Sequence, residues 1–161
     1  MILGMTTFTF VHVLLSLVGI FSGFIVLFGL LTARRMQAWT LLFVVTTVAT
    51  SATGFGFPFD HLLPSHIVGI ISLVVLAFAI LALYVYRLVR AWRWIYVITA
   101  VLALYLNVFV LVAQAFLKIP ELHALAPTQN EPPFAIAQGV VLLLFVAVGT
   151  VAVRRFQPWW R

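Results

Sequence analysis

The sequence predicts an all-α, polytopic integral membrane protein, built as a bundle of five transmembrane helices. Two features of the composition indicate this class: 65% of the 161 residues are hydrophobic, and only 7% are charged. A soluble domain is typically about 45–50% apolar and about 25% charged. The polar side chains are too few to cover the surface of a soluble fold of this size. We therefore expect lipid to be the solvent.

Each predicted span is a mostly apolar segment of about the 20 residues that a helix needs to cross the hydrocarbon core. No charged residue interrupts the middle of any of these segments. We therefore predict a single transmembrane domain that covers residues 1–161. Its spans are 7–32, 39–57, 66–88, 94–117 and 134–153, and the two loops on the outer side are 58–65 and 118–133.

The basic residues predict the orientation, because Lys and Arg concentrate in cytoplasmic loops. Eight of the nine lie at the ends of the first and third spans or in the C-terminal tail. All five tryptophans lie on that same side, where amphipathic rings favour the headgroup level. We expect the N-terminus outside, the C-terminus in the cytoplasm and a cell-membrane location, in a bacterium the inner membrane. Basic residues placed in this way favour lipid contact and predict no nucleic-acid partner.

Small and hydroxyl-bearing residues recur at helical spacing on the first three spans. Helices in lipid associate through close backbone approach and interhelical hydrogen bonds, so these stripes should face one another or a second copy in a homo-oligomer. The stripes are His12, Ser16, Gly19 and Gly23; Thr46, Thr50, Thr53 and Gly54; and His66, Gly69 and Ser72.

Three carboxamides accompany the last two spans: Asn107, Gln114 and Gln138. A carboxamide in mid-membrane is unfavourable unless it faces the bundle interior, so we expect Asn107 to point inward. In the longer outer loop, residues 119–125 predict a short helical turn that starts near Pro120 and could close the outer end of the bundle.

With this orientation, all four histidines and all three carboxylates gather at the outer end. The chain has no cysteine, and imidazole with carboxylate is then the usual ligand set for a transition metal. The candidate metal ligands are His12, Asp60, His61, His66 and His123. No local metal-binding motif supports them, so the prediction depends on several segments converging.

His12 and His66 are the candidate ligands of a b-type haem, because they lie at similar depth on different spans with glycines nearby. A haem there would suit electron exchange with a quinone or a periplasmic redox partner. Each residue also has a simpler interpretation. His12 could hydrogen-bond a hydroxyl across a helix contact, Asp60 could cap the third span, and His61 and His123 could be solvated loop residues.

The primary functional hypothesis is therefore redox transfer or metal handling at an outward-facing site. One alternative is a small-solute or proton-coupled transporter, with a water-reachable cavity running past Asn107. Another is an accessory or scaffold subunit without chemistry of its own. The sequence contains neither a nucleotide-binding P-loop nor a G-x-S-x-G nucleophile motif, and we assign no catalytic residue.

Overall fold

A computed structural model describes residues 6–57 and 64–157, and every regular element in these two ranges is a helix. The elements are α1 (Thr7–Leu31), α2 (Gln37–Gly54), α3 (Pro64–Ile80), the π-helical turn η1 (Leu81–Val85), α4 (Trp92–Lys118), α5 (Pro120–Leu125) and α6 (Pro132–Arg155). Each of the five predicted spans corresponds to one long helix. The short turn predicted near Pro120 is confirmed as α5.

Among the residues that the structure describes, four helical segments are long and apolar enough to cross a membrane: Thr7–Leu31, His66–Val85, Trp92–Lys118 and Pro132–Arg155. These four helices are consistent with a helical, multi-pass membrane protein. The second predicted span, α2, is not one of the four. It begins at a glutamine and carries five threonines and a serine among its 18 residues, which lowers its apolar character. A fifth span and the membrane orientation stay predictions.

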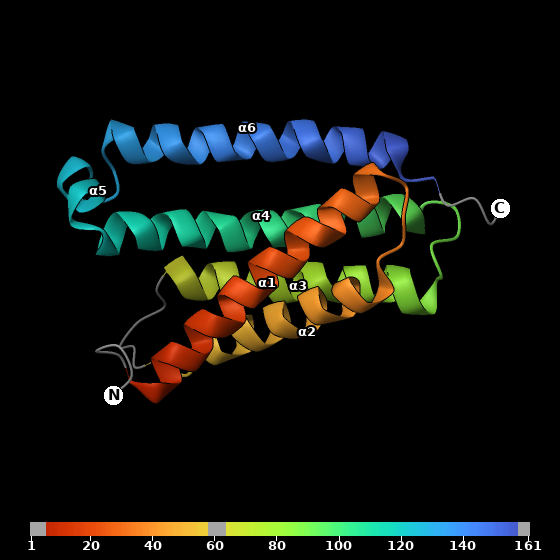
Figure 1. The fold of residues 1–161 in the computed structure, drawn as a ribbon, viewed down its shortest axis with the longest axis horizontal. Helices are drawn as coiled ribbons and strands as arrows, with labels where there is room; N and C mark the ends of the chain where they lie inside the picture. Colours follow the sequence, from red (N-terminus) through yellow and green to blue (C-terminus); the bar gives the residue numbers. More distant parts are fainter. Residues whose placement is uncertain (1–5, 58–63, 158–161) are drawn as a thin grey trace.

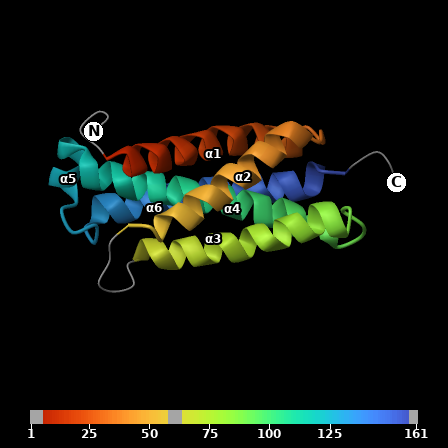
Figure 2. The same ribbon diagram turned by 90° about the horizontal axis from the view of Figure 1, so that it is seen from below.

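The long helices run along the bundle in alternating directions (Figure 1). Helix α4 lies beside α3, α6 and α1, while α1 and α2 pair with each other and cross the other helices obliquely (Figures 1 and 2). The start of α1, the start of α3 and the α4–α6 junction lie at one end, which we call the histidine end. The α1–α2 and η1–α4 connectors and the end of α6 lie at the other, the arginine end.

Connectors at the arginine end use left-handed backbone at residues other than glycine. Ala33 follows α1 with φ 55°, and the Arg34 N–H donates to the Gly29 carbonyl at 2.8 Å, which closes the helix in a Schellman motif. Arg87 also has a positive φ, 48°, in the connector after η1. Turns of this kind let neighbouring helices reverse direction over a few residues.

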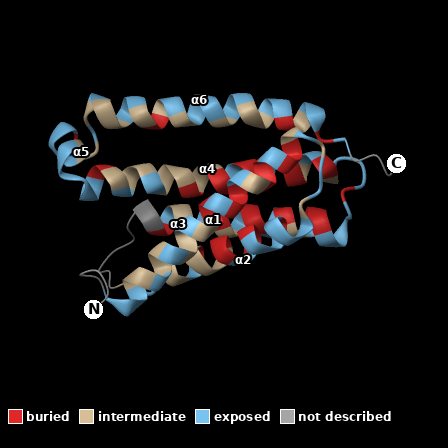
Figure 3. Ribbon diagram, viewed as in Figure 1, coloured by how far each residue is buried: buried red, intermediate tan, exposed pale blue. Residues whose placement is uncertain are grey.

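The apolar core lies in the half of the bundle nearest the arginine end, where Figure 3 shows the buried residues gathered. Its residues come from the end of α1, the start of α2, the end of α3, the start of α4 and the end of α6. Phe43, Leu76, Val97 and Leu104 are at most 2% exposed. The half nearest the histidine end contains fewer buried residues, and there the interior turns polar.

Most large apolar side chains outside this core point away from the protein. Helix α6 is the extreme case, since only Gln138 and Ala152 of its residues are buried (Figure 3). On α6, Ile136 and Leu143 are 65% and 70% exposed. Such an apolar exterior would aggregate in water and is what lipid chains solvate.

Candidate functional site

His12 is held against the last turn of α2 by a hydrogen bond between its Nδ1 and the Thr53 Oγ1, at 2.8 Å. The Thr53 hydroxyl, which has a single proton, also lies 2.7 Å from the Ala49 carbonyl. With its proton on that carbonyl, Thr53 accepts from the His12 Nδ1–H; with its proton on Nδ1, Thr53 donates, so the direction of this bond depends on the His12 tautomer. In the first arrangement Nε2 is the unprotonated nitrogen of the neutral ring.

His66 packs on the same end of α2. Its ring is 3% exposed and stacks on Phe55, with centroids 5.4 Å apart and planes at 27°. The Phe57 ring stands edge-on to His12 at 5.1 Å. The second turn of α1 and the first turn of α3 thus bring His12 and His66 to the C-terminal end of α2.

Beside His12, a cavity of about 90 Å³ lies among α1, α2, α3 and α4. Most of its surface is apolar, and polar residues from all four helices contribute to the lining: His12, Ser16, Thr50, Ser51, Ser72 and Asn107. Gly54 and Gly69 complete the wall together with Val68, Leu106 and Val110. The three stripes of small residues predicted from the sequence therefore face one another within the chain.

Two hydroxyls at this cavity lack a hydrogen-bond partner among the described residues, the Thr50 Oγ1 and the Ser72 Oγ, and both are buried. A buried hydroxyl without a partner costs about 1–3 kcal/mol. At about 30 Å³ for each molecule, the cavity has room for about three waters. Water or a polar solute next to these two residues would supply the missing hydrogen-bond partners.

Asn107 forms the floor of the cavity and points inward, as predicted. Its Nδ2 donates to the Thr47 Oγ1 at 3.1 Å. Gly19 makes this approach possible, because a Cβ there would lie 3.2 and 3.3 Å from the Thr46 and Thr47 hydroxyl oxygens. Asn107 and Gly19 were predicted from the sequence, but Thr47 was not. The predicted stripe on the second span contains Thr46, the neighbouring residue, instead.

Beyond Asn107 toward the arginine end, the interior closes. A Cβ at Gly23 would lie 2.6 Å from the Leu104 Cδ1 and 2.9 Å from the Phe43 ring. These contacts bring α1, α2 and α4 together with no space left between them. The cavity therefore ends at Asn107, against the apolar core.

The remaining predicted site residues are separate from this cavity. His123 on α5 and Gln114 on α4 are exposed. Gln138 is buried and joins α6 to α4, because its Nε2 donates to the Phe109 carbonyl at 3.1 Å. Asp60 and His61 lie outside the described residues. Within residues 6–57 and 64–157, no three His, Asp or Glu side chains come together as a metal site.

A haem does not fit the cavity beside His12 in the shape that the described residues give it. Pockets for organic cofactors and ligands are usually about 300–1,000 Å³, whereas this cavity is about 90 Å³. Phenylalanine rings also cover part of each imidazole, Phe57 at His12 and Phe55 at His66. A single ion or a few small molecules match the space better.

The loop between α5 and α6 is ordered by Glu131, which precedes α6. Its carboxylate accepts hydrogen bonds from the Thr128 N–H and hydroxyl, at 3.1 and 2.9 Å, and from the Asn130 N–H at 3.1 Å. Slight desolvation raises the pKa of the Glu131 carboxyl, but these donors outweigh it and hold that pKa below its ordinary value. The Gln129 Nε2 ties the loop to α4 through the Ala113 carbonyl, at 2.7 Å.

The arginine end contains one interaction that the sequence analysis missed. Arg93, interpreted as a topology determinant, is 7% exposed, and its Nη1 donates to the Phe156 carbonyl just after α6, at 2.8 Å. A guanidinium here also complements the negative end of the α6 dipole.

No family model, curated protein or solved structure matches the chain.

Proposed function

We propose that the protein admits water and a small hydrophilic solute from the histidine end into the cavity beside His12, as a small transporter in which His12 exchanges a proton. The observation that carries the proposal is that Thr50 and Ser72 both line one cavity and that their buried hydroxyls have no partner among the described residues. Water or a solute with hydrogen-bonding groups would satisfy both. An apolar ligand would satisfy neither.

His12 suits proton exchange because it lines the cavity, and its hydrogen bond to Thr53 engages Nδ1 and leaves Nε2 for the proton. The solute is small: an occupant of about 90 Å³ has the volume of about three water molecules. Asn107 supplies a further hydrogen-bonding group at the cavity floor. Passage across the membrane then requires the contact between Phe43 and Leu104 at Gly23 to open, so the described conformation corresponds to a state closed toward the arginine end.

Within this proposal, we place the protein in the inner membrane of a bacterium, with the histidine end outside. Eight of the nine basic residues flank the predicted spans on the side opposite the histidines, and this distribution supports that orientation. The helix α2 would be a fifth, partly polar span, stabilised because its threonines donate to carbonyls one turn earlier, as Thr46 does to Leu42 at 2.7 Å.

The absence of cysteine from the chain allows a direct test by substituted-cysteine labelling in proteoliposomes. We expect Thr50→Cys and Ser72→Cys to react with a membrane-impermeant thiol reagent added to the histidine side. Leu104→Cys, at a site that is 1% exposed in the apolar core, is the matched control and should stay unlabelled. The proposal fails if the two cavity cysteines react only after unfolding, or if Leu104→Cys reacts as fast as they do.

A second measurement tests the proton-exchange role of His12. Vesicles that contain the protein and a trapped pH dye should dissipate an imposed pH gradient faster than empty vesicles, and His12→Gln should remove the difference. The variant Gln can still donate to Thr53, so the helix contact is retained. Equal proton flux for the wild-type protein and His12→Gln would exclude the role.

Metal binding is a second candidate, favoured by the hydrogen bond between His12 and Thr53. A ligating imidazole usually donates its other N–H to a neighbouring acceptor, and Thr53 provides that acceptor. His12 and His66 would then hold a transition metal, with Asp60, His61 or His123 added from the loops, for redox transfer or metal handling. Elemental analysis of the purified protein beside His12→Ala tests this: equal metal content in both would exclude it.

A further inference from the structure

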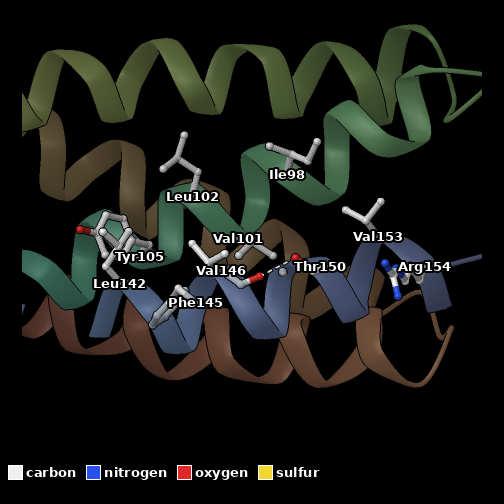
Figure 4. Close-up of a pocket in the computed structure, with 11 residues that line it drawn as sticks. Ile98, Val101, Leu102, Tyr105, Leu142, Phe145, Val146, Thr150, Val153 and Arg154 are labelled. Carbon is white, nitrogen blue, oxygen red and sulfur yellow. Dashed lines mark hydrogen bonds between the residues drawn. The ribbon is translucent and has the colours of Figure 1, made fainter. Parts of the chain in front are cut away.

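A second hollow lies on the outside of the bundle, where α6 packs shallowly against α4. This groove has a volume of about 420 Å³ and runs between the two helices toward the arginine end (Figure 4). Ile98, Leu102 and Tyr105 contribute one wall, and Leu142 and Phe145 belong to the other. Its volume is larger than that of the cavity beside His12, and its lining is more apolar.

The groove makes no demand for a hydrogen-bonding occupant. The Thr150 hydroxyl, the polar group midway along it, donates to the Val146 carbonyl at 2.7 Å (Figure 4). Apart from the Tyr105 hydroxyl, the only other polar group of the lining is the Arg154 guanidinium, which lies at the arginine end of the groove and is exposed. The occupant should therefore be apolar along most of its length and anionic at one end.

Within the described residues, no carboxylate is close enough to supply that negative charge. The acidic side chains there are Glu121 and Glu131, and both belong to the α5 region at the histidine end (Figure 1). Arg154 thus places a positive charge at the headgroup level of a membrane, next to an apolar groove. An anionic phospholipid has the complementary distribution, a phosphate above an acyl chain.

We propose that the α4–α6 groove binds one acyl chain of an anionic phospholipid, with the lipid phosphate at Arg154. A helix of another protein fits less well. Close helix association in lipid needs small residues, and the glycine of this groove, Gly149, is already covered: a Cβ there would lie 3.2 Å from the Val101 Cγ1. The exposed walls are bulky side chains between which a narrow, flexible chain can lie.

The test compares two lipids with the same acyl chains, phosphatidylglycerol and phosphatidylcholine, binding to the full-length protein in detergent by native mass spectrometry. We expect phosphatidylglycerol to bind about fivefold more tightly, the factor typical of one basic side chain at an anionic surface. Arg154→Gln should abolish this preference. Arg155→Gln changes an exposed arginine of the same helix that does not line the groove, and it should keep the preference.

Two further measurements distinguish binding of the lipid acyl chain from binding of the lipid phosphate. Thr150→Phe fills the groove from an exposed position and should weaken both lipids while leaving the thermal unfolding temperature in detergent unchanged. Inorganic phosphate should not compete, because it lacks the acyl chain. The proposal is wrong if Arg154→Gln and Arg155→Gln behave alike, if free phosphate displaces the lipid, or if Thr150→Phe disrupts a dimer and leaves lipid binding unchanged.

Discussion

Replacing the cavity hydroxyls by groups of similar shape distinguishes a hydrated cavity from a dry one by the sign of the stability change. Thr50→Val and Ser72→Ala each remove one buried oxygen that has no partner among the described residues. In a dry cavity, the loss of such an oxygen should stabilise the protein by about 1–3 kcal/mol. In a cavity that holds water or solute, each variant loses a hydrogen bond and should destabilise the protein by about 1 kcal/mol.

We expect destabilisation, because the proposed function requires an occupied cavity. For a domain of this length, 1 kcal/mol corresponds to about 2–4 °C in the unfolding midpoint. Each variant should therefore unfold about 2–4 °C below the wild-type protein, as measured by far-UV circular dichroism in detergent. Because both oxygens line one cavity of about 90 Å³, the double variant should lose less than the sum of the two single changes.

Thr150→Val is the matched control for this series. Thr150 is exposed on α6 and donates only to the Val146 carbonyl of its own helix, at 2.7 Å. Its loss should change the free energy of unfolding by less than about 0.5 kcal/mol. An increase in the unfolding midpoint for both Thr50→Val and Ser72→Ala, with Thr150→Val unchanged, would show a dry cavity and refute the reasoning.

Three further predictions concern the frame around the cavity. Gly23→Ala should lower stability by about 1–3 kcal/mol in detergent unfolding through overpacking, whereas Gly139→Ala, with no atom within 4 Å of its Cβ position, should be neutral or stabilising. Arg93→Met removes the donor to the Phe156 carbonyl and should cost about 1.5–3 kcal/mol in the same assay. Because the pKa of Glu131 is lowered by folding, its contribution to loop order is complete above the ordinary value near 4.5. That contribution should disappear as the pH falls through the lowered pKa, seen as less protection of the Thr128 and Asn130 amides relative to their intrinsic exchange rates, and Glu131→Gln should abolish this pH dependence.

The sequence predicted the helices and the cavity stripes because both depend on rules that act along the chain. Apolar length is sufficient to locate a helix in lipid, and small residues at helical spacing mark where helices approach. At Gly19, which belongs to one of these stripes, the Thr46 and Asn107 side chains approach the α1 backbone closely. The inward direction of Asn107 followed from the unfavourable energy of a carboxamide facing lipid chains, and its bond to Thr47 agrees with it.

Contacts that depend on how two distant helices meet could not be predicted in this way. Arg90 and Arg93 belong to the same basic connector, yet Arg93 is buried against the end of α6, while Arg90 is exposed with φ 51°. Nothing in the local pattern separates them, because the difference arises from the packing of α6 on α4. Gln114 and Gln138 differ for the same reason: α6 packs against α4 through Gln138, while Gln114 stays exposed on α4.

Stability alone does not account for the cavity beside His12. The same helices place apolar side chains tightly in the adjoining half of the bundle, where Phe43 and Leu104 close around Gly23. Alanine or valine at positions 50 and 72 would fill the wall equally well and leave no hydroxyl unsatisfied. The Thr53 and Asn107 bonds satisfy other polar groups at the helix contacts, whereas the Thr50 and Ser72 hydroxyls and the Gln138 Oε1 have no partner among the described residues. Two of these three atoms belong to residues that line one cavity. Local departures of this kind, retained against stability, are expected where a molecule binds.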